Sequence, residues 1–375
     1  DDWSEFIDSL QVDSDADLES GFASALDRIE VSVARLDAFG LELEHAGLAI
    51  TRAEDAWRVV VSNPKVDGVI RVPDADDQPL AVDLAYMRIE GEEDQETDPF
   101  EDIDPRDYMP VDFSTRELRV GEDDYGSWQV AFRPDEEGAV LTDVRASIRG
   151  LQVVGESAIS WRPTRDGGHS TFQGTVRTDD LAKALTEFGY ASSIEGKGMQ
   201  FGADISWPGS PAMIDLLKLK GQVAIESGQG RFVQVERGGT GALKLLGIFD
   251  FASLARRFRF DFSDIVDSGY TFDKVTGVVG FNEGRVDIVD PVVIEGASSI
   301  FKVGGSVDLD AETLDNDMIV TLPVGRNLPW YAAYSAIATG PLVGAGVFIA
   351  QKVFEDKINA MSSAKYKVGG TLDEP

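Results

Sequence analysis

Apolar and polar residues alternate with a period of two over most of this chain. The alternation begins after residue 27, in short runs broken by Gly, Pro, Asp and Asn. Such runs predict half-buried antiparallel strands, each with one apolar and one hydrated face. In the first half, the apolar positions of these runs are Ile29, Val31, Val33, Leu41, Leu43, Trp57, Val59, Val61, Leu80, Val82, Leu84, Tyr86, Val111, Phe113, Trp128, Val130, Phe132, Val144, Ala146, Ile148, Ile159 and Trp161.

The same rhythm returns in the second half. A strand is predicted near residues 199–207, and residues 258–262 alternate strictly, with three phenyl rings on one side. The closing strand is predicted at residues 366–372. The other apolar positions are Val223, Ile225, Val233, Val235, Val286, Ile288, Val292, Ile294, Phe301, Val303, Val307, Leu309, Met318, Val320 and Leu322.

Few helices interrupt these strands. Thr178 can cap a helix over residues 179–188, with two aspartates in its first turn, where the helix dipole favours negative charge. A short apolar helix is predicted near residues 242–254. The pattern therefore predicts a mainly β fold, with an antiparallel sheet of roughly twenty short strands. Open sheets rarely exceed about ten strands, so this sheet must curl, split or wrap. Its apolar face is then either covered by folding over, as in a sandwich or barrel, or left as a groove.

One stretch lacks charged side chains altogether, residues 327–351. Gly340 and Pro341 divide it into two pieces, and Pro interrupts a helix. The stretch is interpreted either as a buried hairpin of two short helices or as a membrane-contacting segment, with a single transmembrane span as a third alternative. Its candidate membrane-contact residues are Leu328, Trp330, Tyr331, Tyr334, Ile337, Leu342, Val343, Val347 and Phe348.

Composition narrows the functional classes. The formal net charge of −33 argues against non-specific nucleic-acid binding, which requires a basic face. The chain has no cysteine and two histidines, so it offers no disulfide and little material for a metal site. The acidic insert at residues 90–107 lacks EF-hand spacing and is interpreted as a solvated loop rather than a calcium site. No phosphate-binding GxxxxGK[ST] motif occurs. No catalytic constellation is recognisable either, and no cofactor is expected. An enzyme acting on envelope glycans would need paired carboxylates, and the sequence shows no such pairing.

Several motifs of the second half resemble one family. They are DISWPGSP at residues 204–211, DFSDI at 261–265, GYTFD at 269–273, VIEG at 293–296, GGSVDL at 304–309, LPW at 328–330 and GPLVG at 340–344. In this order they resemble the C-terminal region of the YhdP branch of the AsmA-like proteins, which are related to TamB. The resemblance covers residues 175–375 and continues upstream as rhythm alone.

The resemblance implies a large, non-enzymatic envelope protein of Gram-negative bacteria. Its long sheet is expected to curl into an open apolar groove across the periplasm, and to move phospholipids between inner and outer membranes. The charge-free stretch would lie at the outer-membrane end, and a segment missing from this sequence would anchor the protein in the inner membrane. The alternative function is a scaffold for outer-membrane protein or envelope assembly, with envelope proteins as partners. The expected groove residues are Phe201, Ile205, Phe258, Phe260, Phe262, Val286, Ile288, Ile294, Phe301 and Val303.

Four segments are expected along the chain. Residues 1–27 form an acidic lead-in, and residues 28–175 a repetitive β-groove segment that contains the acidic loop. Residues 176–325 form a second β-groove segment with the two predicted helices. Residues 326–375 hold the apolar helical hairpin and the closing strand.

Overall fold

The computed structural model describes residues 28–38, 41–75, 77–90, 98, 100, 103–164, 168–188, 194–232, 270–297, 299–323 and 361–371. Within these ranges the chain is mainly β, with very few helices. Seventeen strands belong to one large, open, mixed sheet, and three short strands form a second sheet. The mainly β expectation is therefore confirmed. The chain divides into two compact units. The N-terminal unit comprises Asp1–Ile148 and Gly155–His169, and the C-terminal unit comprises Arg149–Val154 and Ser170–Pro375.

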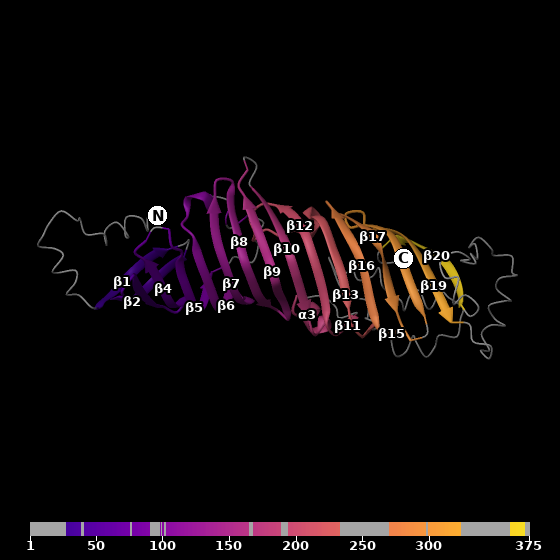
Figure 1. The fold of residues 1–375 in the computed structure, drawn as a ribbon, viewed down its shortest axis with the longest axis horizontal. Coiled ribbons are helices and arrows are strands. Elements are labelled where there is room, and N and C mark those ends of the chain that lie inside the picture. The colour runs from indigo at the N-terminus through magenta and orange to yellow at the C-terminus, as the bar shows by residue number, and fades with distance from the viewer. Residues whose placement is uncertain are drawn as a thin grey trace, which may run out of the picture. The chain divides into compact units, whose positions relative to one another are not determined.

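The N-terminal unit is a succession of strands in which each pairs with the next along the chain, from β1 to β8 (Figure 1). The strands are β1 (Arg28–Ala38), β2 (Leu41–Arg52), β3 (Ala56–Ser62), β4 (Val66–Pro73), β5 (Leu80–Ile89), β6 (Val111–Val120), β7 (Asp123–Asp135) and β8 (Gly138–Ile148), followed by β9 (Leu151–Arg162), which belongs to both units. Because tight turns join most neighbours, most pairs are antiparallel, as the alternation predicted.

One pair departs from the antiparallel expectation. Strands β5 and β6 are parallel, with Leu80 opposite Val111 and Ile89 opposite Val120. A parallel pair needs a crossover of a dozen or more residues, because the chain must return to the same end of the sheet. The acidic insert lies between these two strands and supplies that length. Its described part includes a single 3-10 turn, η1 (Pro105–Asp107), which Asp104 caps.

The C-terminal unit contains the remaining strands of the large sheet and all of the three-stranded sheet. Its elements are β10 (His169–Thr178), α3 (Leu181–Glu187), β11 (Ile194–Gly196), β12 (Met199–Pro208), the 3-10 turn η2 (Leu216–Lys218), β13 (Lys220–Ser227), β14 (Gly230–Phe232), β15 (Tyr270–Phe272), β16 (Lys274–Asn282), β17 (Arg285–Glu295), β18 (Ile300–Asp308), β19 (Thr313–Pro323) and β20 (Met361–Thr371). In the large sheet, the antiparallel order runs β12, β13, β16, β17, β18, β19, β20. The second sheet has the order β11, β14, β15.

Helix α3 starts later than predicted. Asp180, not Thr178, is the N-cap, and its carboxylate accepts a hydrogen bond from a backbone N–H of the first turn. The Thr178 hydroxyl instead accepts a hydrogen bond from the Asp180 backbone N–H at 3.1 Å, which stabilises the turn that precedes the helix. Within the predicted span, Leu181 and Ala184 are buried, whereas Phe188 is 37% exposed. The other predicted helix, residues 242–254, lies outside the described residues, as does the C-terminal hairpin.

Strand β17 carries an irregularity at its centre. The register with β18 shifts between Ile288 and Val292, so Val289, Asp290 and Pro291 are accommodated as a bulge. A bulge also explains how a strand interior holds Pro291, which has no N–H to donate. The bulge sharpens the local twist and bend of the sheet, a curvature whose position the sequence rhythm alone did not predict.

Candidate functional site

The large sheet of the C-terminal unit has one apolar face, defined by alternate residues of seven adjacent strands. The strand register places these residues on one face. Phe201 lies opposite Ile225, and Ile294 lies opposite Phe301. Val303 lies opposite both Val292 and Met318. Directly opposed residues point to the same side of a sheet. The described members of the expected groove set, all of which lie on this face, are Phe201, Ile205, Val286, Ile288, Ile294, Phe301 and Val303.

These residues differ in exposure. Ile294 is 0% exposed, and Val286 and Val303 are also buried, so these three belong to a packed core. The rest of the described set keeps part of its surface open, namely Phe201, Ile205, Ile288 and Phe301. The structure therefore brings the described set together on one surface, and their contact with a ligand stays a prediction. Phe258, Phe260 and Phe262 lie outside the described residues.

A second layer packs on this apolar face. Tyr270, Phe272 and Phe232, from the three-stranded sheet, share a core cluster with Val292, Ile294 and other residues of the large sheet. The Tyr270 ring meets Phe301 edge-on at 5.0 Å between centroids. The Tyr270 hydroxyl hydrogen bonds with the Ser299 hydroxyl at 2.8 Å. This burial raises the pKa of Tyr270. Sequence reasoning missed this layer because its strands are three residues long, too short for a period of two to be visible.

The N-terminal unit presents its own apolar face. Its core consists of Leu43, Ala46, Leu48, Ile50, Val59, Val61, Val66 and Leu84. Larger side chains on β3 to β7 continue the face and are only half-buried: Trp57, Ile70, Val72, Val82, Phe113, Trp128, Val130 and Phe132. Registration again aligns them, with Val82 opposite Phe113 and Phe113 opposite Val130. The expected groove set contained none of these residues, although the alternation around Trp57 and Trp128 pointed to them.

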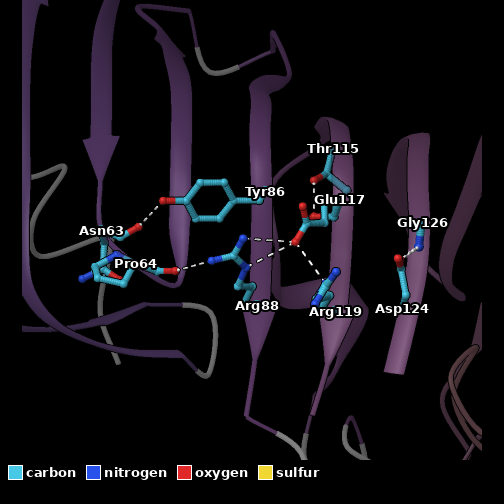
Figure 2. Close-up of polar contacts among 9 residues, drawn as sticks. All are labelled: Asn63, Pro64, Tyr86, Arg88, Thr115, Glu117, Arg119, Asp124 and Gly126. Carbon is cyan, nitrogen blue, oxygen red and sulfur yellow. Dashed lines mark hydrogen bonds and ion pairs between the residues drawn. The ribbon is translucent and has the colours of Figure 1, made fainter. Parts of the chain in front are cut away.

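The opposite face of the N-terminal unit is polar. Met87 lies opposite Leu118 in the parallel pair, so the next residues, Arg88 and Arg119, face each other on the other side. Two like charges in direct opposition are unfavourable, and Glu117 resolves the conflict by bridging both. Its Oε1 lies 3.2 Å from Arg88 Nη2 and 3.1 Å from Arg119 Nε (Figure 2).

The same cluster ties β5 to a neighbouring turn. Figure 2 shows the Tyr86 hydroxyl donating to the Asn63 backbone carbonyl, at 2.9 Å. Arg88 stacks over the Tyr86 ring, 4.4 Å from its centroid, and donates to the Pro64 carbonyl at 3.3 Å. Asn63 is buried and donates in turn to the Glu44 carbonyl. The cluster thus links β5 to the turn after β3 and to β6 on the hydrated face.

The ionisable side chains form exposed ion pairs. Arg52 donates both terminal nitrogens to Asp74, at 2.6 and 2.5 Å, which lowers the pKa of Asp74. Arg106 likewise holds the pKa of Asp104 at about 2. Within the described ranges, no three His or acidic side chains come together as a metal ion would need. What these pairs can do chemically is neutralise charge at the surface of an acidic chain.

The charge-free stretch and its candidate membrane residues, Leu328 to Phe348, lie outside the described residues. In the part of the chain that the structure covers, no helix is both long and apolar enough to cross a membrane.

Comparison with known proteins identifies the family. The "Intermembrane phospholipid transporter YhdP" of Escherichia coli (strain K12) is 26% identical over 247 residues, which cover 65% of this chain and 19% of that protein. The match thus spans about a fifth of that relative's length. No solved structure matches. The family model described as "YhdP protein" matches residues 1–375. This chain, with its large open sheet, therefore belongs to the YhdP family.

Proposed function

We propose that this chain is a segment of a phospholipid conduit, in which acyl chains move along the apolar face of the sheet. The half-buried side chains of the N-terminal unit carry this proposal, because adjacent strands align large apolar groups that are still partly open to solvent: Trp57, Ile70, Val82, Phe113, Trp128, Val130 and Phe132. The name of the E. coli relative, a phospholipid transporter, supports the same substrate class.

The physical role of such a face is to lower the barrier for moving hydrocarbon through water. Each CH₂ group withdrawn from water is stabilised by about 0.8 kcal/mol. A two-chain lipid therefore gains many times the thermal energy from a continuous apolar surface. A surface of similar aliphatic and aromatic groups offers many near-equivalent positions, which suits passage because no single position holds the lipid too tightly.

The cellular setting follows from the same proposal. The protein acts in the periplasm, between the two membranes of a Gram-negative envelope, and performs no chemistry on the lipid. The charge-free stretch, residues 327–351, contacts the outer membrane through Leu328, Trp330, Tyr331 and its other large apolar residues. Phe201, Ile205, Ile288 and Phe301, half-buried on the C-terminal apolar face, contact lipid in that unit.

The test compares two neighbouring residues of β7. Val130 is half-buried on the apolar face, opposite Phe113, and Gln129 is exposed on the other face, opposite Ser114. The protein is purified without detergent, and its bound lipid is extracted and measured by mass spectrometry. We expect phospholipid in the wild type and in Gln129→Asp, and a several-fold loss in Val130→Asp, because a carboxylate disfavours hydrocarbon beside it.

Unfolding curves show whether both variants keep the fold. A folded, lipid-free wild type would contradict the conduit and favour the scaffold function. Equal lipid content in two folded variants would contradict the assignment of this face.

A further inference from the structure

One polar side chain interrupts the apolar face of the C-terminal unit. Asn316, on β19, is 2% exposed, and among the residues that the structure describes its side-chain oxygen Oδ1 has no hydrogen-bond partner. Along the strand its same-face neighbours are Leu314 and Met318, both buried. Across the strands it lies opposite Gly305 on β18 and Val368 on β20. A lone acceptor thus lies among apolar groups.

This arrangement is costly for the fold. A buried carbonyl without a donor loses its hydration without compensation, and such groups are rare in native proteins. Asn is also a poor strand residue, whereas Val or Leu at this position would continue the surrounding pattern. The packing of the described residues therefore does not account for an Asn at position 316.

A glycine on the neighbouring strand lies beside this amide, although the Asp315 carbonyl oxygen comes closer still to that position. Gly305 has a positive φ of +131°, and a Cβ there would lie 2.6 Å from Asn316 Oδ1. Any larger residue at 305 would collide with the amide. Two residues on adjacent strands thus combine to place one acceptor on the apolar face.

We propose that Asn316 is a polar contact for the lipid on this face, accepting a hydrogen bond from an N–H or O–H donor that the lipid carries. This inference rests on the proposed conduit and deepens it by naming the lipid class. An ethanolamine ammonium or a free glycerol hydroxyl can donate to Oδ1, whereas a choline headgroup has no N–H. The neighbours Leu314, Met318 and Val368 are buried and make the surroundings of this acceptor apolar.

A methylation series tests the inference. Binding of phosphatidylethanolamine, its N,N-dimethyl derivative and phosphatidylcholine, all with the same acyl chains, is measured on the detergent-free chain. We expect the first two to bind about fivefold more tightly than phosphatidylcholine, since each keeps an N–H and one net hydrogen bond has about that effect. If the donor is a glycerol hydroxyl, the same advantage appears for lysophosphatidylcholine over its 2-O-methyl ether.

Substitution then locates the effect. In Asn316→Leu the advantage of the donor lipids disappears, and the melting temperature rises because the orphan acceptor is gone. Met318→Leu, a same-face control beside it, changes the binding of all lipids alike. Asn316→Val serves the same purpose if leucine is too large for the site.

Each other outcome overturns a distinct claim. If every lipid binds the wild type equally, or if the advantage survives Asn316→Leu, the assignment of Asn316 is wrong and the conduit stands. A lower melting temperature for both variants would show that the amide has a structural partner, which also overturns it. If the wild type binds none of the lipids, the conduit itself fails.

Discussion

At the scale of single residues, alternation assigned most faces correctly but could not find the exceptions, such as Tyr86, which a register shift between β4 and β5 moves to the hydrated face. The apolar positions of β12, β17 and β18 lie on one face as the period of two required. The cap of α3 was misplaced because Thr178 and Asp180 are both good hydrogen-bond acceptors, and only the backbone path decides between them. Alternation places Asn316 on the same face as Leu314 and Met318, but it cannot show that the amide oxygen there is buried without a partner among the described residues.

Gly304 and Gly305 are adjacent in β18 and allow a matched test of which position requires glycine. At Gly305, with φ at +131°, a Cβ would lie 2.3 Å from the Asp315 carbonyl oxygen, whereas a Cβ at Gly304 meets nothing within 4 Å. We expect Gly305→Ala to lower the unfolding free energy by about 3 kcal/mol, through strain and collision, and Gly304→Ala to change it by less than about 1 kcal/mol. Urea unfolding of both variants measures the difference. Equal effects would mean that β18 does not take this path.

At the scale of elements, the strands and their mostly antiparallel pairing were predictable, but the one parallel pair was not. Alternation of apolar and polar residues favours antiparallel pairing overall, but it does not show which individual neighbours run parallel. The parallel pair of β5 and β6 could have been inferred only from the length of the acidic insert, which exceeds that of the other connections between neighbouring strands of the N-terminal unit. Its acidity drew attention to calcium, whereas its length is what the topology requires.

The parallel connection between β5 and β6 should tolerate shortening only down to about a dozen residues. Deleting residues 91–97 leaves more than the dozen or so residues that a parallel connection needs, so we expect the fold and melting temperature to be nearly unchanged. Deleting residues 91–104 leaves too few to return across the sheet. Backbone N–H groups of β5 and β6 should then lose protection against hydrogen exchange. Retained protection in the longer deletion would contradict the parallel register.

The second layer of the C-terminal unit predicts a response to alkaline pH. The raised pKa of Tyr270 means that folding keeps this phenol protonated. Its contribution to stability is fully present below the unfolded-state pKa of about 10 and is lost as pH rises through the folded-state pKa. We expect the wild type to lose unfolding free energy more steeply above about pH 10 than Tyr270→Phe. Parallel pH curves would show that this hydroxyl is hydrated and that β15 does not pack on Phe301.

At the scale of the whole molecule, the net charge of −33 sets the response to salt. The ion pairs on the described strands are exposed, as for Arg52 and Asp74, and such pairs contribute little each. Repulsion among the excess carboxylates therefore outweighs the attraction within these pairs, and salt screens that repulsion. We expect the melting temperature to rise by several degrees as NaCl increases from about 20 to about 300 mM, where the Debye length falls well below 10 Å. A falling melting temperature would mean that the ion pairs dominate.

The sequence was sufficient for the fold class and the family, because both depend on features repeated along the chain. The motif at residues 304–309 lies almost wholly within strand β18, and the alternating runs of the described residues form strands of the sheet. The sequence did not predict which residues cover the apolar face of the C-terminal unit, because the layer containing Tyr270 and Phe232 is built from segments distant in sequence. It also did not single out the half-buried surface around Phe113 and Trp128, which depends on exposure rather than on pattern.

The most direct test of the conduit is site-specific photo-crosslinking in living Gram-negative cells. A photoreactive amino acid is placed at Trp128, on the apolar face, and in a second strain at Gln129, its exposed neighbour on the other face. If acyl chains move along this face, phospholipid is captured at position 128 and not at position 129. Capture of protein alone at position 128, or of phospholipid equally at both positions, would contradict the conduit.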